Sequence, residues 1–138
     1  MPFGEAAFRA FVRRSSDTRL ERTVGSDRGL KVVFAAMARA YRPERAAGWT
    51  GDIRYELKRA DGMVRAWTVS CDATSAKARA AAMPSPALTV RLALADFIRL
   101  AGRDLDPVKA LLTGRMDLEG DFDVAARLGE MFGQPSTY

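Results

Sequence analysis

The side chains that most often carry enzyme chemistry are scarce in this sequence. It contains no histidine, which excludes Ser-His-Asp and Cys-His catalysis, histidine-ligated zinc or iron, and the usual general base near neutral pH. Its one cysteine, Cys71, ends a predicted strand, where a cysteine is most often a small buried hydrophobe. A single cysteine also excludes an internal disulfide and a CxxC site. We therefore predict no catalytic residue.

The densest group of carboxylates lies between residues 117 and 123. Its spacing of two resembles part of a calcium-binding loop, but Arg115 and apolar residues interrupt the pattern. A strand face followed by a helix cap explains the same carboxylates without a metal. Phosphate-binding loops of the GxGxxG or GxxxxGK type are absent as well. The sequence therefore predicts neither a metal site nor a cofactor. The four carboxylates belong to Asp117, Glu119, Asp121 and Asp123.

Length and composition indicate one domain with a basic surface. The 138 residues are 48% hydrophobic and 28% charged, which is typical of a domain that folds without disulfides or metal. The 22 Lys and Arg against 17 Asp and Glu give a net charge of +5, which favours anionic partners in general. These charges neither cluster nor alternate with exposed aromatic residues, so we expect a solvated surface and no nucleic-acid partner. The sequence has no signal-peptide pattern and no apolar run near the ~20 residues of a membrane span, so we expect a cytoplasmic protein.

Hydrophobic periodicity predicts an α+β fold. A period of 3.6 predicts helices over 3–14, around Leu20, and over 27–42, 96–101, 106–114 and 121–132. A period of 2 predicts strands over 53–58, 63–71, 88–94 and 116–119. The alanine-rich segment 76–83 favours a helix equally on propensity, but two flanking turns favour a strand. The expected architecture is a mostly antiparallel five-stranded sheet covered by helices.

Apolar stripes on the predicted helices stand out more than any polar motif. Segments around Phe97 and Leu111, and over 30–41 and 122–132, carry large apolar residues at helical spacing. These stripes could form one closed core over the sheet. They could instead line a cavity for an apolar ligand, because small residues such as Ala125 stand beside large ones. Periodicity alone leaves both interpretations open.

The C-terminal half carries a recognisable pattern of packing residues. It reads Leu94-Ala95-Asp96-Phe97 … Leu100-Ala101-Gly102, then Asp106-Pro107 … Ala110-Leu111-Leu112-Thr113-Gly114, then Met116 … Leu118 … Gly120-Asp121 … Ala125 … Leu128 … Met131-Phe132. Upstream it is joined by Val33-Phe34 … Met37 … Tyr41-Arg42-Pro43-Glu44 … Ala47-Gly48 and Ile53-Arg54-Tyr55. Over residues 25–133 this order resembles the sterol carrier protein type two lipid-transfer family, as written in its bacterial single-domain members.

The resemblance implies an apolar tunnel between the sheet and the helices. Such a tunnel holds a fatty acyl chain, acyl-CoA or a sterol for binding or transfer, without catalysis and without a cofactor. The residues predicted to line it are Phe34, Met37, Trp67, Leu92, Phe97, Leu111, Leu112, Met116, Leu118, Phe122, Ala125, Leu128, Met131 and Phe132. Two alternatives remain: a structural or oligomerisation domain with a filled core and no ligand, and an enzyme that acts on a lipid.

Residues 1–24 are predicted to form a helical extension before a single domain over 25–138. The first helix combines an apolar face, Phe3, Phe8, Phe11 and Val12, with the basic residues Arg9, Arg13 and Arg14. This combination suits transient contact of residues 3–14 with an anionic membrane surface. The same face could instead pack on the domain, or on a second copy in a homodimer. The sequence leaves these alternatives open.

Overall fold

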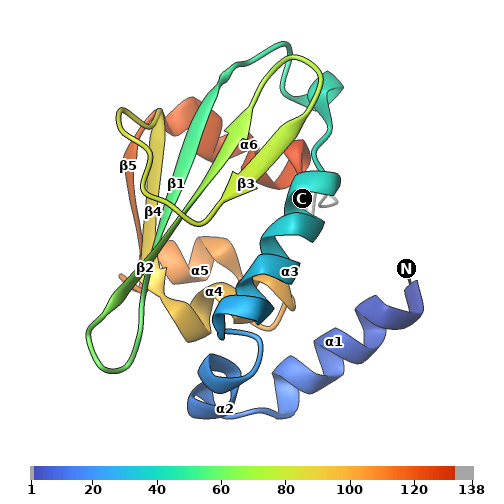
Figure 1. Ribbon diagram of the computed structural model, residues 1–138, viewed down its shortest axis with the longest axis vertical. Helices are drawn as coiled ribbons and strands as arrows, with labels where there is room; N and C mark the ends of the chain where they lie inside the picture. Colours follow the sequence, from blue (N-terminus) through green and yellow to red (C-terminus); the bar gives the residue numbers. More distant parts are fainter. Residues whose placement is uncertain (1, 133–138) are drawn as a thin grey trace. The chain divides into compact units, whose positions relative to one another are not determined.

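The computed structural model describes the backbone of residues 2–132 and the side chains of residues 5–132. Figure 1 shows the helices in chain order: α1 (Pro2–Arg14), α2 (Asp17–Arg22), α3 (Asp27–Arg39), the 3-10 helix η1 (Pro43–Arg45), α4 (Leu94–Ala101), α5 (Pro107–Leu112) and α6 (Phe122–Met131). The strands are β1 (Gly51–Lys58), β2 (Val64–Cys71), β3 (Ala76–Arg79), β4 (Leu88–Ala93) and β5 (Met116–Gly120). They form one sheet in the order β3-β2-β1-β4-β5. The predicted α+β class and five-stranded sheet are confirmed.

The sheet is mostly antiparallel, with one parallel pair. At the start of β4, the Ala87 N–H donates to the carbonyl of Asp52 at the start of β1 (2.9 Å). Because both strands begin at this bond, we infer that β1 and β4 are the parallel pair. On the other side of β4, the Asp121 N–H after β5 donates to the Ala87 carbonyl (2.8 Å), as expected for antiparallel strands.

The described residues group into two compact units. Unit 1 comprises residues 2–30, 57–65 and 91–117, and unit 2 comprises residues 31–56, 66–90 and 118–132. Unit 1 therefore holds the helices α1, α2, α4 and α5 and the turn between β1 and β2. Most of the sheet, most of α3, and α6 belong to unit 2. The predicted boundary after residue 24 stays a prediction.

Local signals explain the starts of α2 and α5 in unit 1. The Ser16 hydroxyl accepts from the Arg19 N–H and begins α2, and the Asp106 carboxylate accepts from the Lys109 N–H and begins α5. The predicted start of α4 at Asp96 is wrong by two residues. Helix α4 begins at Leu94 directly from β4, with no side-chain cap, and Asp96 lies in its first turn, where its carboxylate binds Arg115.

Gly102 directly follows the last residue of α4. Its φ is −86°, and the next residue, Arg103, takes the left-handed position with a φ of 58°. A Cβ on Gly102 would lie 2.8 Å from Cγ2 of Val12. Glycine is therefore needed because α1 packs closely against the end of α4.

Two element ends differ from prediction in unit 2. Helix α3 ends at Arg39, not near Arg42, because Arg42 is extended before Pro43 and its N–H donates to the Met131 carbonyl (2.6 Å). Segment 76–83 is a strand, as predicted, but β3 ends at Arg79. Beyond it, the Thr68 hydroxyl donates to the Ala81 carbonyl (2.7 Å) and accepts from the Met83 N–H (3.1 Å), so a side chain replaces the backbone ladder.

Candidate functional site

An aromatic cluster fills the centre of unit 2. The Phe34 ring of α3 stacks on Trp67 of β2 with centroids 4.6 Å apart and an angle of 3° between the planes. The Tyr55 ring of β1 meets the edge of Phe34 at 5.5 Å. All three side chains are buried, so α3 is held to the sheet mainly by large aromatic contacts.

A second contact joins the residues after α3 to the end of α6. The Tyr41 ring lies 5.4 Å from the ring of Phe132, and the Tyr41 hydroxyl donates to the Asp72 carbonyl at 3.1 Å. Burial raises the pKa of the Tyr41 hydroxyl, with smaller contributions from the charges of Cys71 and Asp72. The phenol is therefore a neutral donor at physiological pH and positions Phe132.

Helix α6 has two different apolar faces. Asp121 caps the helix, as predicted, by accepting from the N–H groups of Asp123 and Val124. Val124 and Met131 are fully buried and lie on the same face, because residues seven apart share a face of a helix. The adjacent face is only half-buried and consists of Ala125, Leu128 and Phe132. Phe122, on the far side of this half-buried face, is 64% exposed.

The fourteen predicted ligand-contacting residues divide between the two units. Five lie in unit 1: Leu92, Phe97, Leu111, Leu112 and Met116. Leu92 and Phe97 are buried, Met116 is half-buried, and Leu111 and Leu112 are exposed. Nine lie in unit 2: Phe34, Met37, Trp67, Leu118, Phe122, Ala125, Leu128, Met131 and Phe132. Within unit 2, the half-buried members Met37, Leu118, Ala125, Leu128 and Phe132 are the ones that a ligand could reach without displacing the core.

The polar chemistry of unit 2 does not favour a reactive site. Cys71 is buried, and burial raises the pKa of its thiol to about 12, with added contributions from the Asp52 and Asp72 carboxylates. Such a thiol is neutral at physiological pH and is a poor nucleophile. Within residues 5–132, no group of three His, Cys, Asp or Glu side chains is arranged to hold a metal ion. The Asp121 carboxylate serves as the helix cap described above.

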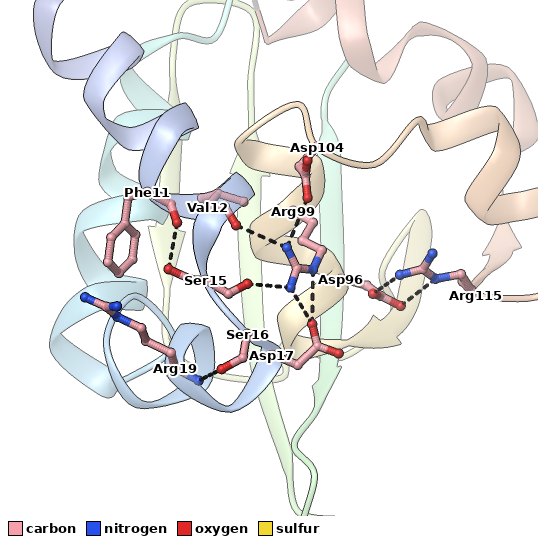
Figure 2. Close-up of polar contacts among 10 residues, drawn as sticks. All are labelled: Phe11, Val12, Ser15, Ser16, Asp17, Arg19, Asp96, Arg99, Asp104 and Arg115. Atoms are coloured by element: carbon pink, nitrogen blue, oxygen red, sulfur yellow. Dashed lines mark hydrogen bonds and ion pairs between the residues drawn. The ribbon is translucent and has the colours of Figure 1, made fainter.

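Sequence reasoning missed a polar cluster in unit 1 that Figure 2 shows. The Arg99 guanidinium of α4 donates to the carbonyls of Val12 (3.1 Å) and Ser15 (2.9 Å) at the end of α1. It also binds the Asp17 carboxylate (2.7 Å) and the Asp104 carboxylate (3.0 Å). We call these five residues the Arg99 cluster. Its one sequence signal is a pair of charged residues in an otherwise apolar helix, Leu94–Ala101.

The cluster fastens α1 and α2 to α4 within unit 1. Next to it, the Asp96 carboxylate and the Arg115 guanidinium form two parallel bonds of 2.6 and 3.2 Å. The Arg19 guanidinium lies 5.1 Å from the centroid of the Phe11 ring. Val12 is buried, whereas Phe8 and Phe11 are half-buried. The Phe3 side chain, part of the predicted membrane-facing set, lies outside the described residues.

The fold is an α+β domain with half-buried apolar faces, and the described part of the chain contains no cluster suited to hold a metal ion. The model of the SCP-2 sterol transfer family matches residues 31–133. The chain belongs to this family, and the resemblance that its sequence suggests is confirmed. No curated protein sequence matches the chain. Within residues 2–132, no helix has the length and apolar character needed to cross a membrane.

Solved structures are similar over most of the chain. The crystal structure of sterol carrier protein 2-like 2 from Aedes aegypti is 29% identical with a TM-score of 0.60, covering 73% of this chain and 94% of that chain. The solution structure of palmitated SCP2L2 from Aedes aegypti is 27% identical with a TM-score of 0.60, covering 79% and 95%.

One similar structure is part of a much larger enzyme. The inverting sec-alkylsulfatase from Pseudomonas sp. is 23% identical with a TM-score of 0.58, covering 76% of this chain but 16% of that chain. At this identity the likeness shows the fold alone. The same fold thus occurs both as a separate chain and as a small part of an enzyme.

Proposed function

We propose that this chain binds an apolar lipid against the half-buried face of α6 and carries it without catalysis. The observation that carries the proposal is the half-buried face formed by Ala125, Leu128 and Phe132, in a chain of the SCP-2 sterol transfer family. A closed core buries such residues fully, as it does Val124 and Met131 on the adjacent face. The palmitated form of the Aedes aegypti relative supports a saturated fatty acyl chain as the first ligand to test.

Burial of the acyl chain supplies enough free energy for such binding. Each buried methylene contributes ~0.8 kcal/mol, so a 16-carbon chain offers on the order of 12 kcal/mol before losses. Association and ordering of a flexible chain remove much of this, which leaves affinity in roughly the micromolar range. Specific polar contacts to a headgroup are unnecessary for this affinity. The proposed ligand class is therefore fatty acyl chains and sterols, defined by apolar area.

The proposal includes no chemical step. The buried thiol of Cys71, with its raised pKa, is unsuited to attack an acyl-CoA thioester. We expect the purified chain to bind acyl-CoA without hydrolysing it. Turnover that disappears on Cys71→Ala would instead support the enzyme alternative.

The test compares two tryptophan substitutions on α6. Leu128→Trp fills the half-buried face and should weaken binding of a fluorescent fatty acid at least about tenfold, because added bulk takes the ligand's space. Glu130→Trp places the same side chain at an exposed position of α6 and should leave the affinity within about twofold. Equal affinity of both variants and the wild type would overturn the proposed site. Native mass spectrometry of the purified chain should show a co-purifying lipid.

The alternative of a filled structural domain predicts a different pair of results. If Leu128 packs in a solid core, Leu128→Trp destabilises the fold by about 1–3 kcal/mol through overpacking, and no variant binds fatty acid. Urea unfolding of the two variants therefore separates a ligand site from a filled core.

We also propose that residues 3–14 contact an anionic membrane during lipid transfer. The half-buried Phe8 and Phe11 and the exposed Arg9, Arg13 and Arg14 support this contact. Deleting residues 1–14 should slow transfer from anionic vesicles and leave the affinity for a soluble fatty acid unchanged. Because Val12 and Ser15 are buried within the Arg99 cluster, loss of folding on deletion would support the packing alternative. Loss of a native dimer would support packing on a second copy.

A further inference from the structure

The turn between β1 and β2 exposes two adjacent apolar side chains. Met63 is 60% exposed and Val64 is 53% exposed. Both belong to unit 1, which contains five of the seven large apolar side chains exposed among residues 5–132. We call residues 58–65 the β1–β2 tip; it is the loop between these strands in Figure 1.

The tip is an ordered turn held by backbone and side-chain hydrogen bonds. The Arg59 N–H donates to the Met63 carbonyl (2.8 Å), and the Gly62 N–H donates back to the Arg59 carbonyl (2.9 Å). Gly62 has a φ of 89°, a conformation that favours glycine. The Asp61 carboxylate accepts from the Met63 N–H at 2.9 Å. Met63 and Val64 are thus exposed by a defined turn.

The tip is also fastened to the N-terminal part of the chain. The Ala60 N–H donates to the Glu21 carboxylate of α2 at 2.9 Å. The Arg65 guanidinium lies 3.4 Å from the Asp27 carboxylate at the start of α3. These contacts hold the tip in a fixed position relative to the helices of unit 1.

The basic charge lies in the unit that carries the tip. Residues 58–65 contain Lys58, Arg59 and Arg65; Arg59 lies 3.8 Å from the Asp61 carboxylate and Arg65 is paired with Asp27, whereas Lys58 is exposed. The surrounding unit is basic: the residues of unit 1 include 14 Lys and Arg against nine Asp and Glu, whereas unit 2 has eight of each. The whole net charge of +5 is therefore carried by unit 1.

We infer that the β1–β2 tip is a contact site for an anionic lipid surface, with Met63 and Val64 entering the interface and the exposed Lys58, within the basic unit 1, attracting the headgroups. Two apolar side chains are too few for a specific protein interface, which buries roughly 1,200–2,000 Å². An anionic bilayer needs only a small apolar insertion combined with basic charge. This inference rests on the proposed function, because a lipid carrier must meet the surface from which it takes its ligand.

The test uses the same substitution at two exposed valines. Val64→Asp places a charge on the tip, and Val32→Asp places it on α3 in the neutral unit 2, where Val32 is 63% exposed. Binding is measured by sedimentation with vesicles of phosphatidylcholine and phosphatidylglycerol, and with vesicles of phosphatidylcholine alone. We expect Val64→Asp to weaken binding to the anionic vesicles about tenfold or more, because it removes apolar insertion and adds repulsion. Val32→Asp should stay within about twofold of wild type, as a surface substitution away from the contact.

Met63→Ser removes apolar area without a charge and should also weaken vesicle binding, by a smaller factor. High salt should weaken wild-type binding, because screening acts on the basic residues. Any of three results would overturn the inference. Val64→Asp could bind anionic vesicles as well as the wild type does, or Val32→Asp could lose as much binding as Val64→Asp. The wild type could also bind neutral vesicles as well as anionic ones. Fatty-acid affinity in solution reports the proposed function separately: it should be unchanged in every variant, and its absence in the wild type would contradict the proposed function but not the vesicle result.

Discussion

The two units of this chain are stabilised in different ways. Unit 1 has a mainly aliphatic core: among its described residues, Phe97 is the one buried aromatic. Its helices are joined by the Arg99 cluster and the Asp96–Arg115 pair. Unit 2 has an aromatic core in which Phe34 contacts Trp67 and Tyr55. Unit 1 is basic and unit 2 is neutral.

The differences in core composition and charge indicate that the two units have different properties within one small chain. In unit 2, large aromatic contacts fix α3 on the sheet, and the proposed lipid-binding face of α6 lies in the same unit. Unit 1 supplies charge, exposed apolar side chains and a polar attachment for the N-terminal helices. Substitutions should therefore act mainly through packing in unit 2 and mainly through hydrogen bonds and charge in unit 1.

The largest effect is expected in the aromatic core of unit 2. Phe34→Ala removes the stack on Trp67 and the edge contact with Tyr55, and should lower the free energy of unfolding by about 3–5 kcal/mol. Phe122→Ala is the matched control, because Phe122 is largely exposed; its effect should stay within about 0.5 kcal/mol. Urea unfolding measures both. Similar losses in the two variants would contradict the assignment of the core.

A smaller and more local effect is expected in the Arg99 cluster. Arg99→Ala leaves two backbone carbonyls and the Asp17 and Asp104 carboxylates without their donor, at a cost of about 2–3 kcal/mol. Hydrogen exchange should accelerate in α1 and α2 while the amides of unit 2 stay protected. Arg99→Lys should not restore protection, because one ammonium cannot reach four acceptors held by a planar guanidinium. Uniform acceleration throughout the chain would mean that the two units unfold together.

The contact of α1 with α4 gives a third, smaller effect. Gly102→Ala introduces a Cβ that meets Val12 and should destabilise unit 1 by about 1–3 kcal/mol. Val12→Ala in the same chain relieves the contact, so the double variant should lose less than the sum of the two single losses. Additive losses would show that Gly102 is required for another reason.

The smallest effect at neutral pH is expected at Cys71. Cys71→Ala should change stability by less than about 1 kcal/mol at pH 7 and fatty-acid affinity by less than about twofold, because the thiol acts as a small buried hydrophobe. Its folded pKa of about 12 lies above the ordinary value of 9.0, so the unfolded chain loses this proton first. The wild type should therefore lose stability relative to Cys71→Ala as the pH rises from 9 towards 12.

Burial raises the pKa of the Tyr55 hydroxyl in both chains, and the charge of Cys71 adds a smaller contribution that is absent from Cys71→Ala. Unfolding curves at several pH values measure the difference. Ellman's reagent should react slowly with the native wild type and rapidly after unfolding. Rapid reaction of the native thiol would contradict its burial in unit 2.

Features set by nearby residues were predictable from the sequence. Asp106 followed by Pro107 and the Gly120-Asp121 pair begin helices because a carboxylate satisfies N–H groups two or three residues further along the chain. The turn at Asp61-Gly62 follows equally from local conformational preference. The order of packing residues was enough to indicate the family, which the match over residues 31–133 shows.

Element ends that depend on distant partners were not predictable. Helix α3 ends early because Arg42 bonds to Met131, and β3 ends early because Thr68 takes over the hydrogen bonds of the next residues. Asp96 lies in the first turn of α4 and not at its start, and its carboxylate binds Arg115, nineteen residues away. These contacts join residues far apart in the sequence, so the conformational propensity of nearby residues could not predict them.

The sequence by itself therefore determined the α+β class, the strand and helix order, the family and the lack of histidine chemistry. Tertiary structure alone decided that Arg99 binds Asp17, 82 residues away, and that evenly scattered charges collect as +5 in one unit and zero in the other. It also decided which apolar stripe of α6 is buried and which stays half-exposed. The physical reason is that caps and turns are satisfied within a few residues, whereas charge distribution and burial depend on which distant segments the fold brings together.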